Sequence, residues 1–473
     1  MDAIEICLTL SAFCVGILTV AIYDVVYRVS GSKLLILLTL FGAITGISYV
    51  VTQVLSGQRF DIVFLDLLTE GKPRPRILAT AGAVAGIGWG ILQFVSQKSP
   101  SRIPLSLVAA GATACTVATG LIIAWDSEFD IERFQPSVLD DSYGIEELAR
   151  SEQMPIRLAV DEVHNRLYFS TYSTGVNGVY SGSIYAIDLH DDLTSATPLV
   201  VASSPLLYRP FGLACRSGDV YVSRAGHAAH AVHGQVVYSN LGAVTQLKDL
   251  DGDGQFEFFD DLIQGIPAAR GPDTMHQNNG LAFDVEGNLF VAVGSADDRS
   301  LDEHAWSGTI LIHKPGSDKT DVFARGLRNP FGLCCGPANA LFVTDNDCAE
   351  DPGDEVNFVV PNGHYGHPYQ IPGESRVSGF SGPILLGANS NYCGVAYLPS
   401  IDSPESSGAV FVCDRLLNSV LRLNVEFKDG FCSIVDNQVF AKVPSPVDIV
   451  VNSGGELFVA SLEKQRIYRI WPR

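Results

Sequence analysis

The chain has 473 residues, a net charge of −21 and 47% hydrophobic residues. This length predicts two or three domains rather than one small domain. The first 125 residues hold 8 of the 31 basic and 6 of the 52 acidic residues, which leaves 23 basic and 46 acidic residues after them. This excess of negative charge argues against nucleic acid as a partner and favours metal cations and neutral polar substrates.

Four apolar runs stand in the first 125 residues, separated by short polar loops: Cys7–Tyr27, Leu34–Leu55, Ile77–Val95 and Ile103–Trp125. Each run has roughly the 20 residues that a helix needs to cross the hydrocarbon core. A signal peptide does not explain the first run, because no basic segment precedes it and similar runs follow it. We therefore expect residues 1–125 to form an α-helical membrane anchor of about four transmembrane helices, in contact with membrane lipid.

The orientation of this anchor is left open by charge, because the loops on the two sides carry equal numbers of basic residues. An even number of spans places both ends of the anchor on one side of the membrane. We expect the rest of the chain to be extracytoplasmic, on the periplasmic side. The cysteines there are irregularly spaced, without a CxxC pair, which favours buried thiols and leaves one or two disulfides open.

Six similar segments follow an acidic stretch, residues 126–154, which we interpret as a linker because it is low in strand signal. Each segment pairs two apolar or alternating runs across a turn of glycine, asparagine or aspartate, which indicates a β-hairpin. The segments begin at Ile156, Pro210, Asn279, Pro330, Cys393 and Pro446, and a third strand-like run follows most of them. This repetition predicts an all-β six-bladed propeller over residues 155–473, with Ile467–Trp471 pairing elsewhere to close the ring. A large β-sandwich is the alternative fold.

Polar residues stand just before two of the innermost strands expected in this propeller. His276 precedes that of the third segment, and Arg328 and Asn329 precede that of the fourth in the stretch GLRNPFGL (326–333). Loops entering the innermost strands line one mouth of a propeller channel. A histidine and an arginine facing one cavity suit a general base with an electrostatic partner. A solvated loop histidine and a structural arginine are the plain alternatives.

An acidic loop after Leu247 has the spacing of a calcium site. Oxygen-bearing side chains fall at loop positions 1, 3, 5, 7, 9 and 12, with Gly254 at the sharp turn: Asp249, Asp251, Asp253, Gln255, Glu257 and Asp260. Oxygen ligands at these positions suit calcium. An acidic hairpin turn without an ion remains the alternative.

Four stretches resemble the glucose/sorbosone dehydrogenases, which are six-bladed propellers that use pyrroloquinoline quinone (PQQ). They are LKDLDGDGQFE from Leu247, HQNNGLAFDVEGNLFVAVG from His276, GLRNPFGL, and GDEVNFVVPNGHYGHPY from Gly353. The resemblance extends from about Pro155 to Pro472, with the stretches in the family's order.

The resemblance implies a membrane-anchored oxidoreductase that oxidises a sugar or polyol hydroxyl by hydride transfer to PQQ. His276 would be the catalytic base, Arg328 would stabilise charge on the quinone, and Asn329 would hold the cofactor. Calcium would bridge the quinone to the carbonyls of Ala349 and Glu350. A membrane quinone or another acceptor would receive the electrons.

The chain also departs from the family pattern. Ala349 and Glu350 replace a Gly-Pro pair, Arg415 is the only basic residue near an expected lysine, and Ser445–Ile449 lacks the family's arginines. Two other functions therefore stay open: a non-catalytic ligand-binding or protein-binding propeller, and a calcium-dependent lactonase-type hydrolase. His364 and His367, in GHYGHP, are expected to line the same mouth as His276.

Overall fold

A computed structural model describes most of the chain after residue 133. The described residues are 134–172, 182–189, 196–204, 206–225, 230–232, 235–237, 241–267, 276, 278–295, 304–337, 340–346, 353–369, 379–387 and 390–473. The expected membrane spans, and Ala349 and Glu350, lie outside these residues. Within them, no helix is both long and apolar enough to cross a membrane.

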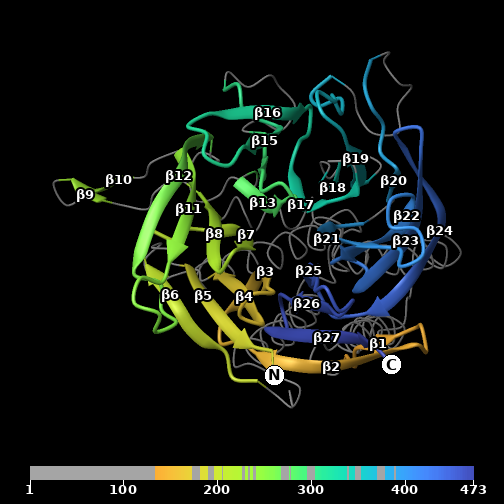
Figure 1. Cartoon of the computed structure of the whole chain (residues 1–473), viewed down its shortest axis with the longest axis horizontal. Helices are drawn as coiled ribbons and strands as arrows, with labels where there is room; N and C mark the ends of the chain where they lie inside the picture. The colour runs from red at the N-terminus through yellow and green to blue at the C-terminus, as the bar shows by residue number, and fades with distance from the viewer. Residues whose placement is uncertain are drawn as a thin grey trace, which may run out of the picture. The chain divides into compact units, whose positions relative to one another are not determined.

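The described residues form six radial antiparallel sheets, the blades of the expected propeller (Figure 1). Blade 1 contains β3 (Met154–Asp161), β4 (Arg166–Tyr172), β5 (Gly182–Asp188) and β6 (Leu199–Ser204). Blade 2 contains β7 (Pro210–Arg216), β8 (Asp219–Arg224), β11 (Leu241–Lys248) and β12 (Phe258–Pro267), with β9 (His230–Val232) and β10 (Gln235–Val237) as a separate hairpin. Blade 3 contains β13 (Asn278–Phe283), β14 (Leu289–Val293), β15 (Thr309–His313) and β16 (Thr320–Arg325).

The remaining blades follow the same order from the channel outward. Blade 4 contains β17 (Pro330–Cys335), β18 (Leu341–Asp345), β19 (Glu355–Val359) and β20 (Leu385–Leu386). Blade 5 contains β21 (Tyr392–Pro399), β22 (Ser407–Asp414), β23 (Ser419–Lys428) and β24 (Phe431–Lys442). Blade 6 contains β25 (Pro446–Val451), β26 (Leu457–Ser461) and β27 (Arg466–Pro472). The six-bladed propeller predicted from the repeats is confirmed.

Two short segments before β3 complete the last two sheets. β2 (Tyr143–Arg150) pairs with β27, and β1 (Ser137–Val138) pairs with the end of β24. The expected closure of the ring through Ile467–Trp471 is therefore confirmed, with β2 as the partner. These two strands lie within the stretch expected to be a linker (126–154). They form because the open edges of β24 and β27 offer them backbone hydrogen-bonding partners.

The second strand of each blade explains the apolar runs in the repeats. All five residues of β14, β18 and β26 are buried, because neighbouring blades cover both faces of each sheet. The first nine residues of the outer strand β24 are instead all exposed or partly buried. The core therefore lies between blades, close to the channel.

Glycines let the innermost strands approach one another around the channel. A Cβ atom at Gly212 would clash with the Asn279 carbonyl, and one at Gly332 would clash with the Cys393 carbonyl. Blade 1 has Arg157 at this strand position and blade 6 has Asp448. These two side chains form an ion pair of 3.2 Å across the seam where the ring closes.

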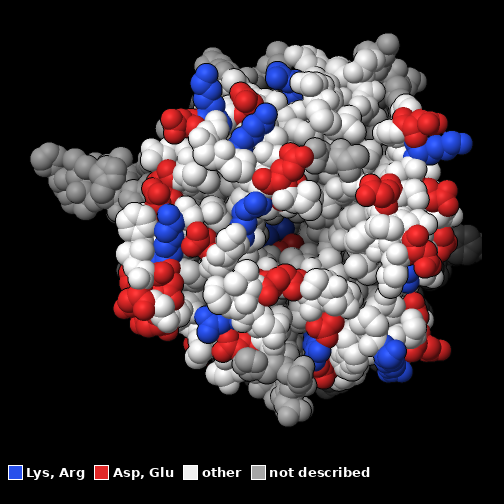
Figure 2. Space-filling model, in the orientation of Figure 1, with Lys and Arg blue, Asp and Glu red and all other residues white. Residues whose placement is uncertain are grey.

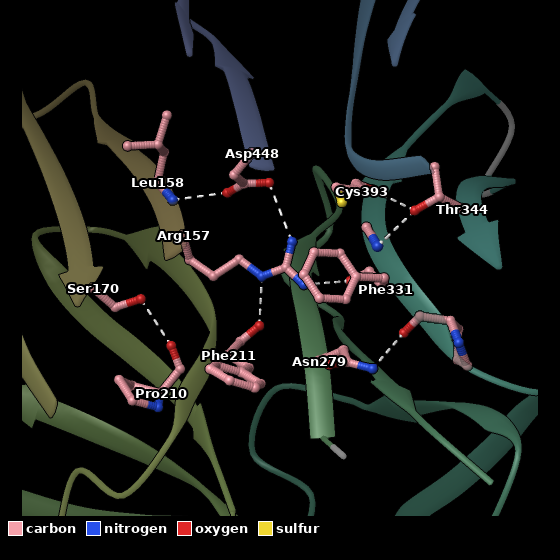
Figure 3. A network of polar contacts seen from close by, with 12 residues as sticks. Arg157, Leu158, Ser170, Pro210, Phe211, Asn279, Phe331, Thr344, Cys393 and Asp448 are labelled. Carbon is pink, nitrogen blue, oxygen red and sulfur yellow. Dashed lines mark hydrogen bonds and ion pairs between the residues drawn. The ribbon is translucent and has the colours of Figure 1, made fainter. Parts of the chain in front are cut away.

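Arg157 also crosses the channel to other blades (Figure 3). Its Nε donates to the Phe211 carbonyl and its NH2 donates to the Phe331 carbonyl, while its guanidinium lies 3.9 Å from the centre of the Phe331 ring. Asp448 additionally accepts the Leu158 N–H at 2.8 Å. This buried network joins blades 1, 2, 4 and 6 at the axis of the propeller.

Candidate active site

The six blades repeat one strand order around the channel, so their innermost strands begin at the same end of it. A recurring backbone bond marks this end: the residue after the second strand donates its N–H to a residue just before the innermost strand. The bond joins Ala225 to Tyr208, Asn346 to Asn329, Arg415 to Asn391, and Leu462 to Ser445. We call this end of the channel the mouth. It is formed by residues that follow the second strands, such as Ser295 and Arg415, and by residues just before the innermost strands: Arg209, His276, Arg328, Asn329, Asn391 and Ser445.

Asp345 holds the backbone of Arg328 and Asn329 at the mouth. Its carboxylate accepts the Arg328 N–H at 3.0 Å and the Asn329 N–H at 2.7 Å. Burial raises the pKa of Asp345 well above its ordinary value, with a further rise from Glu355, while these two N–H bonds and the Arg328 charge oppose the rise. The backbone of Arg328 and Asn329 is therefore held by a buried aspartate, Asp345, which is the last residue of β18.

The side chains of this motif belong to a network across blades 3, 4 and 5. Arg328 donates from NH1 to the Asn346 carbonyl at 2.7 Å. Asn329 accepts from the Asn279 amide at 3.0 Å and donates to the Asn346 side-chain oxygen at 3.3 Å. The Asn346 amide continues to the Tyr392 carbonyl at 2.6 Å. These bonds position the residues of the mouth without a bound ligand.

His276 lies buried at the mouth, with 7% of its surface exposed. Its Nδ1 is 2.8 Å from the Ser295 carbonyl oxygen. Because a carbonyl only accepts, Nδ1 carries the proton in the neutral ring, and Nε2 keeps the lone pair that a general base uses. Ser295 also donates its N–H to the Arg328 carbonyl at 2.7 Å, so one residue joins His276 to Arg328.

The two histidines of GHYGHP take different positions. His367 lies with its Nε2 3.2 Å from the Ser295 hydroxyl, so it shares the mouth with His276 as expected. His364 stacks on Phe380, with ring centres 4.6 Å apart. Burial and the charge of Arg325 lower the pKa of His364, so its ring is neutral near pH 7.

Residues of the mouth that are absent from the sequence-based prediction include Ser295 and Arg209. Ser295 is a strand-end serine without a motif of its own. Arg209, which is 5% exposed, precedes Pro210 as Asn329 precedes Pro330, and the shared letters PFGL after it were the available signal. Arg209 and Ser445 both precede a proline and have φ values of 47° and 44°, which supports their equivalence in blades 2 and 6.

Arg415 lies at the same end of the channel, in blade 5. Its Nε donates to the Asn391 side-chain oxygen at 2.8 Å. Its NH1 lies 3.7 Å from the Oε1 of Glu463, and both of these side chains are partly exposed. The described part of the mouth thus carries three arginines, Arg209, Arg328 and Arg415. The expected calcium carbonyls of Ala349 and Glu350 lie outside the described residues.

The acidic loop lies between β11 and β12 of blade 2, away from the mouth. Ligand atoms of Asp249, Asp251, Asp253 and Glu257 all lie within 4.8 Å of one another. Asp249 accepts the N–H groups of Gly252 and Gly254, and the bond from Gly254 contributes most to lowering its pKa.

The other two residues expected in this calcium loop have different roles. Gln255 donates its backbone N–H to Asp253 at 2.8 Å. Asp260, expected as the last ligand, instead lies in β12 opposite Gln246 and is not part of the carboxylate group. The reason is that β12 begins at Phe258, before the ligand spacing is complete.

A cavity of about 320 Å³ lies on the axis beyond Arg157, on the side away from the mouth. It is lined by the innermost strands from Arg157 and Asp448 onward, including Cys215, Phe283 and Cys335. Figure 2 shows a hollow at the centre of the ring. Because the Arg157 network separates this cavity from the mouth, we do not assign it to the site of His276 and Arg328.

Comparisons with known proteins agree with the fold and with the expected family. Residues 216–378 match the family model described as Glucose / Sorbosone dehydrogenase. This segment contains the acidic loop, His276, GLRNPFGL and GHYGHP, so the match supports the resemblance inferred from those motifs. No curated protein sequence matches the chain.

Solved structures with the same fold include several sugar dehydrogenases. A putative oxidoreductase (glucose dehydrogenase) from Thermus thermophilus has a TM-score of 0.55 at 20% identity, covering 69% of this chain and 99% of that chain. The PQQ-bound aldose sugar dehydrogenase from Streptomyces coelicolor has a TM-score of 0.53 at 18% identity, covering 71% and 98%. A Trichoderma reesei carbohydrate-active enzyme of family AA12 has a TM-score of 0.54 at 14% identity, covering 72% and 98%. At these identities, the likeness shows the fold.

Proposed function

We propose that this chain is a membrane-anchored oxidoreductase that oxidises a hydroxyl group of a sugar or polyol by hydride transfer to a PQQ-type quinone at the mouth. The observation that carries the proposal is the pairing of His276 with Arg328 through Ser295. The pair lies within the segment that matches the sugar dehydrogenase family model. The structurally similar aldose sugar dehydrogenase from Streptomyces coelicolor was solved in its PQQ-bound form, which supports the choice of cofactor.

The charges of the mouth fit such a cofactor. PQQ has three carboxylates, and the described mouth residues include Arg209, Arg328 and Arg415. Guanidinium groups suit carboxylates because their planar donors bind both oxygens at once. The whole chain has a net charge of −21, yet three arginines lie at this end of the channel. An anionic cofactor would therefore bind at the mouth. Arg209, Arg328, Arg415 and Asn329 are the residues that would hold it.

The residues of the mouth would divide the chemistry between them. His276 takes the proton of the substrate hydroxyl at Nε2, and the Ser295 carbonyl then stabilises the imidazolium through Nδ1–H. Arg328 supplies positive charge that its bond to Asn346 keeps in place. The bound quinone would accept the hydride that leaves the same carbon. A positioned base of this kind contributes roughly 10²- to 10⁴-fold in rate.

Calcium is the second cofactor of the proposal. The four clustered carboxylates of the acidic loop (Asp249, Asp251, Asp253 and Glu257) are the hard oxygen ligands that calcium prefers. Because this loop connects β11 and β12 away from the mouth, calcium there would stabilise blade 2 without entering the reaction. A calcium ion beside the quinone, held by Ala349 and Glu350, is a separate proposal that rests on the family pattern.

The membrane part of the proposal rests on the sequence. Four apolar runs in residues 1–125 have the length of membrane spans, and they would hold the propeller on the periplasmic side. A membrane quinone beside the anchor would be a convenient electron acceptor. Protease protection of the propeller in sealed inner-membrane vesicles, with the cytoplasmic face outward, tests this orientation. Digestion of the propeller in such vesicles would refute it.

Blade 6 favours a second candidate, a propeller that binds a ligand without oxidising it. Asp448 in this blade forms an ion pair with Arg157. The segment Ser445–Ile449 contains no basic residue that could bind a cofactor carboxylate at the mouth. Titration of the purified full chain with PQQ, in buffer containing calcium, separates the two functions. Saturable heat that disappears in Arg328→Gln supports the oxidoreductase. Absence of PQQ binding refutes it and favours the binding propeller.

A further inference from the structure

The GHYGHP segment is bound along the chain that leads into GLRNP. Arg325 donates its N–H to the Gly363 carbonyl at 3.0 Å, and the Tyr365 N–H returns to the Arg325 carbonyl at 2.9 Å. The His367 N–H then donates to the Gly326 carbonyl at 2.9 Å. Main-chain bonds therefore set the position of His367, beside the chain two residues before Arg328.

Ser295 is the point where three functional residues meet, and each contacts a different group of it. Its carbonyl accepts from His276 Nδ1 at 2.8 Å, and its N–H donates to the Arg328 carbonyl at 2.7 Å. Its hydroxyl lies 3.2 Å from His367 Nε2. Only 3% of its surface is exposed, so little solvent competes for these bonds.

We propose that His367 is a positioning residue for His276, acting through Ser295; its effect on turnover rests on the proposed function. The two imidazoles contact different atoms of Ser295, the hydroxyl and the carbonyl oxygen. No proton passes between the rings by this route, so the effect is geometric. By holding the Ser295 side chain, His367 keeps the carbonyl aimed at His276 Nδ1, which keeps Nε2 unprotonated and directed at substrate.

Substitutions separate this role from general support of the loop. Ser295→Ala removes the hydroxyl but keeps both backbone groups. His367→Phe keeps a ring of similar shape without a nitrogen, whereas His367→Gln restores a polar group that reaches the hydroxyl. His364→Phe is the matched control, because it changes the other imidazole of the same segment and preserves stacking on Phe380.

The direct readout is the tautomer of His276 in the full chain, seen in long-range proton–nitrogen NMR spectra of histidine-labelled protein. The chain has ten histidines, and the signal lost in His276→Gln identifies the right one. We expect the Nδ1–H tautomer alone in the wild type, His367→Gln and His364→Phe. We expect a mixture of tautomers in His367→Phe and Ser295→Ala. A single unchanged tautomer in both of these variants overturns the proposal.

Kinetics supply an independent arm. Misplacing the base lowers kcat by about 10- to 100-fold in His367→Phe and in Ser295→Ala, with KM within about twofold of the wild type. Because the two residues act through one contact, the double variant loses no more than either single variant. Losses that multiply overturn the proposal. If the wild type oxidises no sugar, the proposed function fails, and the tautomer readout alone still decides the role of His367.

Discussion

Arg157→Met tests whether the propeller is held closed at its axis. The methionine keeps most of the arginine stem and removes the guanidinium. Asp448, which is 7% exposed in the wild type, then loses its ion-pair partner, and the Phe211 and Phe331 carbonyls lose the hydrogen bonds from Arg157. Breaking a buried ion pair from one side costs about 3–5 kcal/mol. At about 2 °C per kcal/mol, the unfolding midpoint of the full chain falls by roughly 6–10 °C.

The pH dependence of this loss has a definite sign. Burial raises the pKa of Asp448, and Arg157 is the largest influence that opposes the rise. Without Arg157 the folded-state pKa of Asp448 rises further above its unfolded value. Because a raised carboxyl pKa means that the folded state binds the proton more readily, acid reduces the penalty. The destabilisation is therefore larger at pH 8 than at pH 5.

Circular dichroism melting of the variants measures both effects. Arg157→Met/Asp448→Asn is the matched control, because it removes the unpaired charge and keeps an acceptor for the Leu158 N–H. We expect it to recover at least half of the lost stability. A midpoint for Arg157→Met within about 2 °C of the wild type, which corresponds to about 1 kcal/mol or less, would contradict a stabilising role of this ion pair at the seam.

Three further predictions concern the ligands of the propeller. Arg209→Gln weakens PQQ binding by about 10- to 100-fold in calorimetry, because one charge-assisted hydrogen bond is lost; an unchanged affinity would remove Arg209 from the cofactor site. Calcium at 100 times its dissociation constant stabilises the wild type by about 2.7 kcal/mol relative to chelator, and Glu257→Gln abolishes this gain, as denaturant unfolding would show. Asp260→Asn keeps the gain, since Asp260 pairs in β12; loss of the gain in this variant would return Asp260 to the ligand set.

The fold was predictable because its repeats carry two separate signals. Two strands joined by a turn recur six times, and the second strand of each pair is rich in apolar residues, as expected for a strand covered on both faces. β1 and β2 were missed for the opposite reason. The sequence YGIEELAR of β2 has little strand pattern, and it becomes a strand because β27 offers an open edge.

The candidate site was predictable where residues stood in a motif. His276 and Arg328 come together as their places before the innermost strands indicated, and His367 joins them from the GHYGHP segment between β19 and β20. Ser295 could not be found in this way, because it contacts His276 and Arg328 through backbone groups that any residue has, and its single hydroxyl belongs to no motif. Arg209 could have been predicted as a residue of the mouth, because its position before Pro210 matches that of Asn329 before Pro330.

The Arg157–Asp448 ion pair could not be predicted from the sequence for a different reason. Each residue occupies the strand position that glycine holds in blades 2 to 5, so each was visible as an exception to the repeat. Their pairing follows only from the ring, which brings the first and last blades together over 291 residues of sequence. Long-range closure of this kind has no local pattern.

Dye reduction by the purified full chain, supplied with PQQ, calcium and a panel of aldoses and polyols, tests whether the mouth oxidises a sugar. We predict sugar-dependent reduction by the wild type. His276→Gln should lose at least about 100-fold in kcat, as expected for a general base, while its PQQ affinity stays unchanged. Reduction that persists at the wild-type rate in His276→Gln would refute His276 as the base, and its absence from the PQQ-loaded wild type with every sugar or polyol would refute the proposed oxidation.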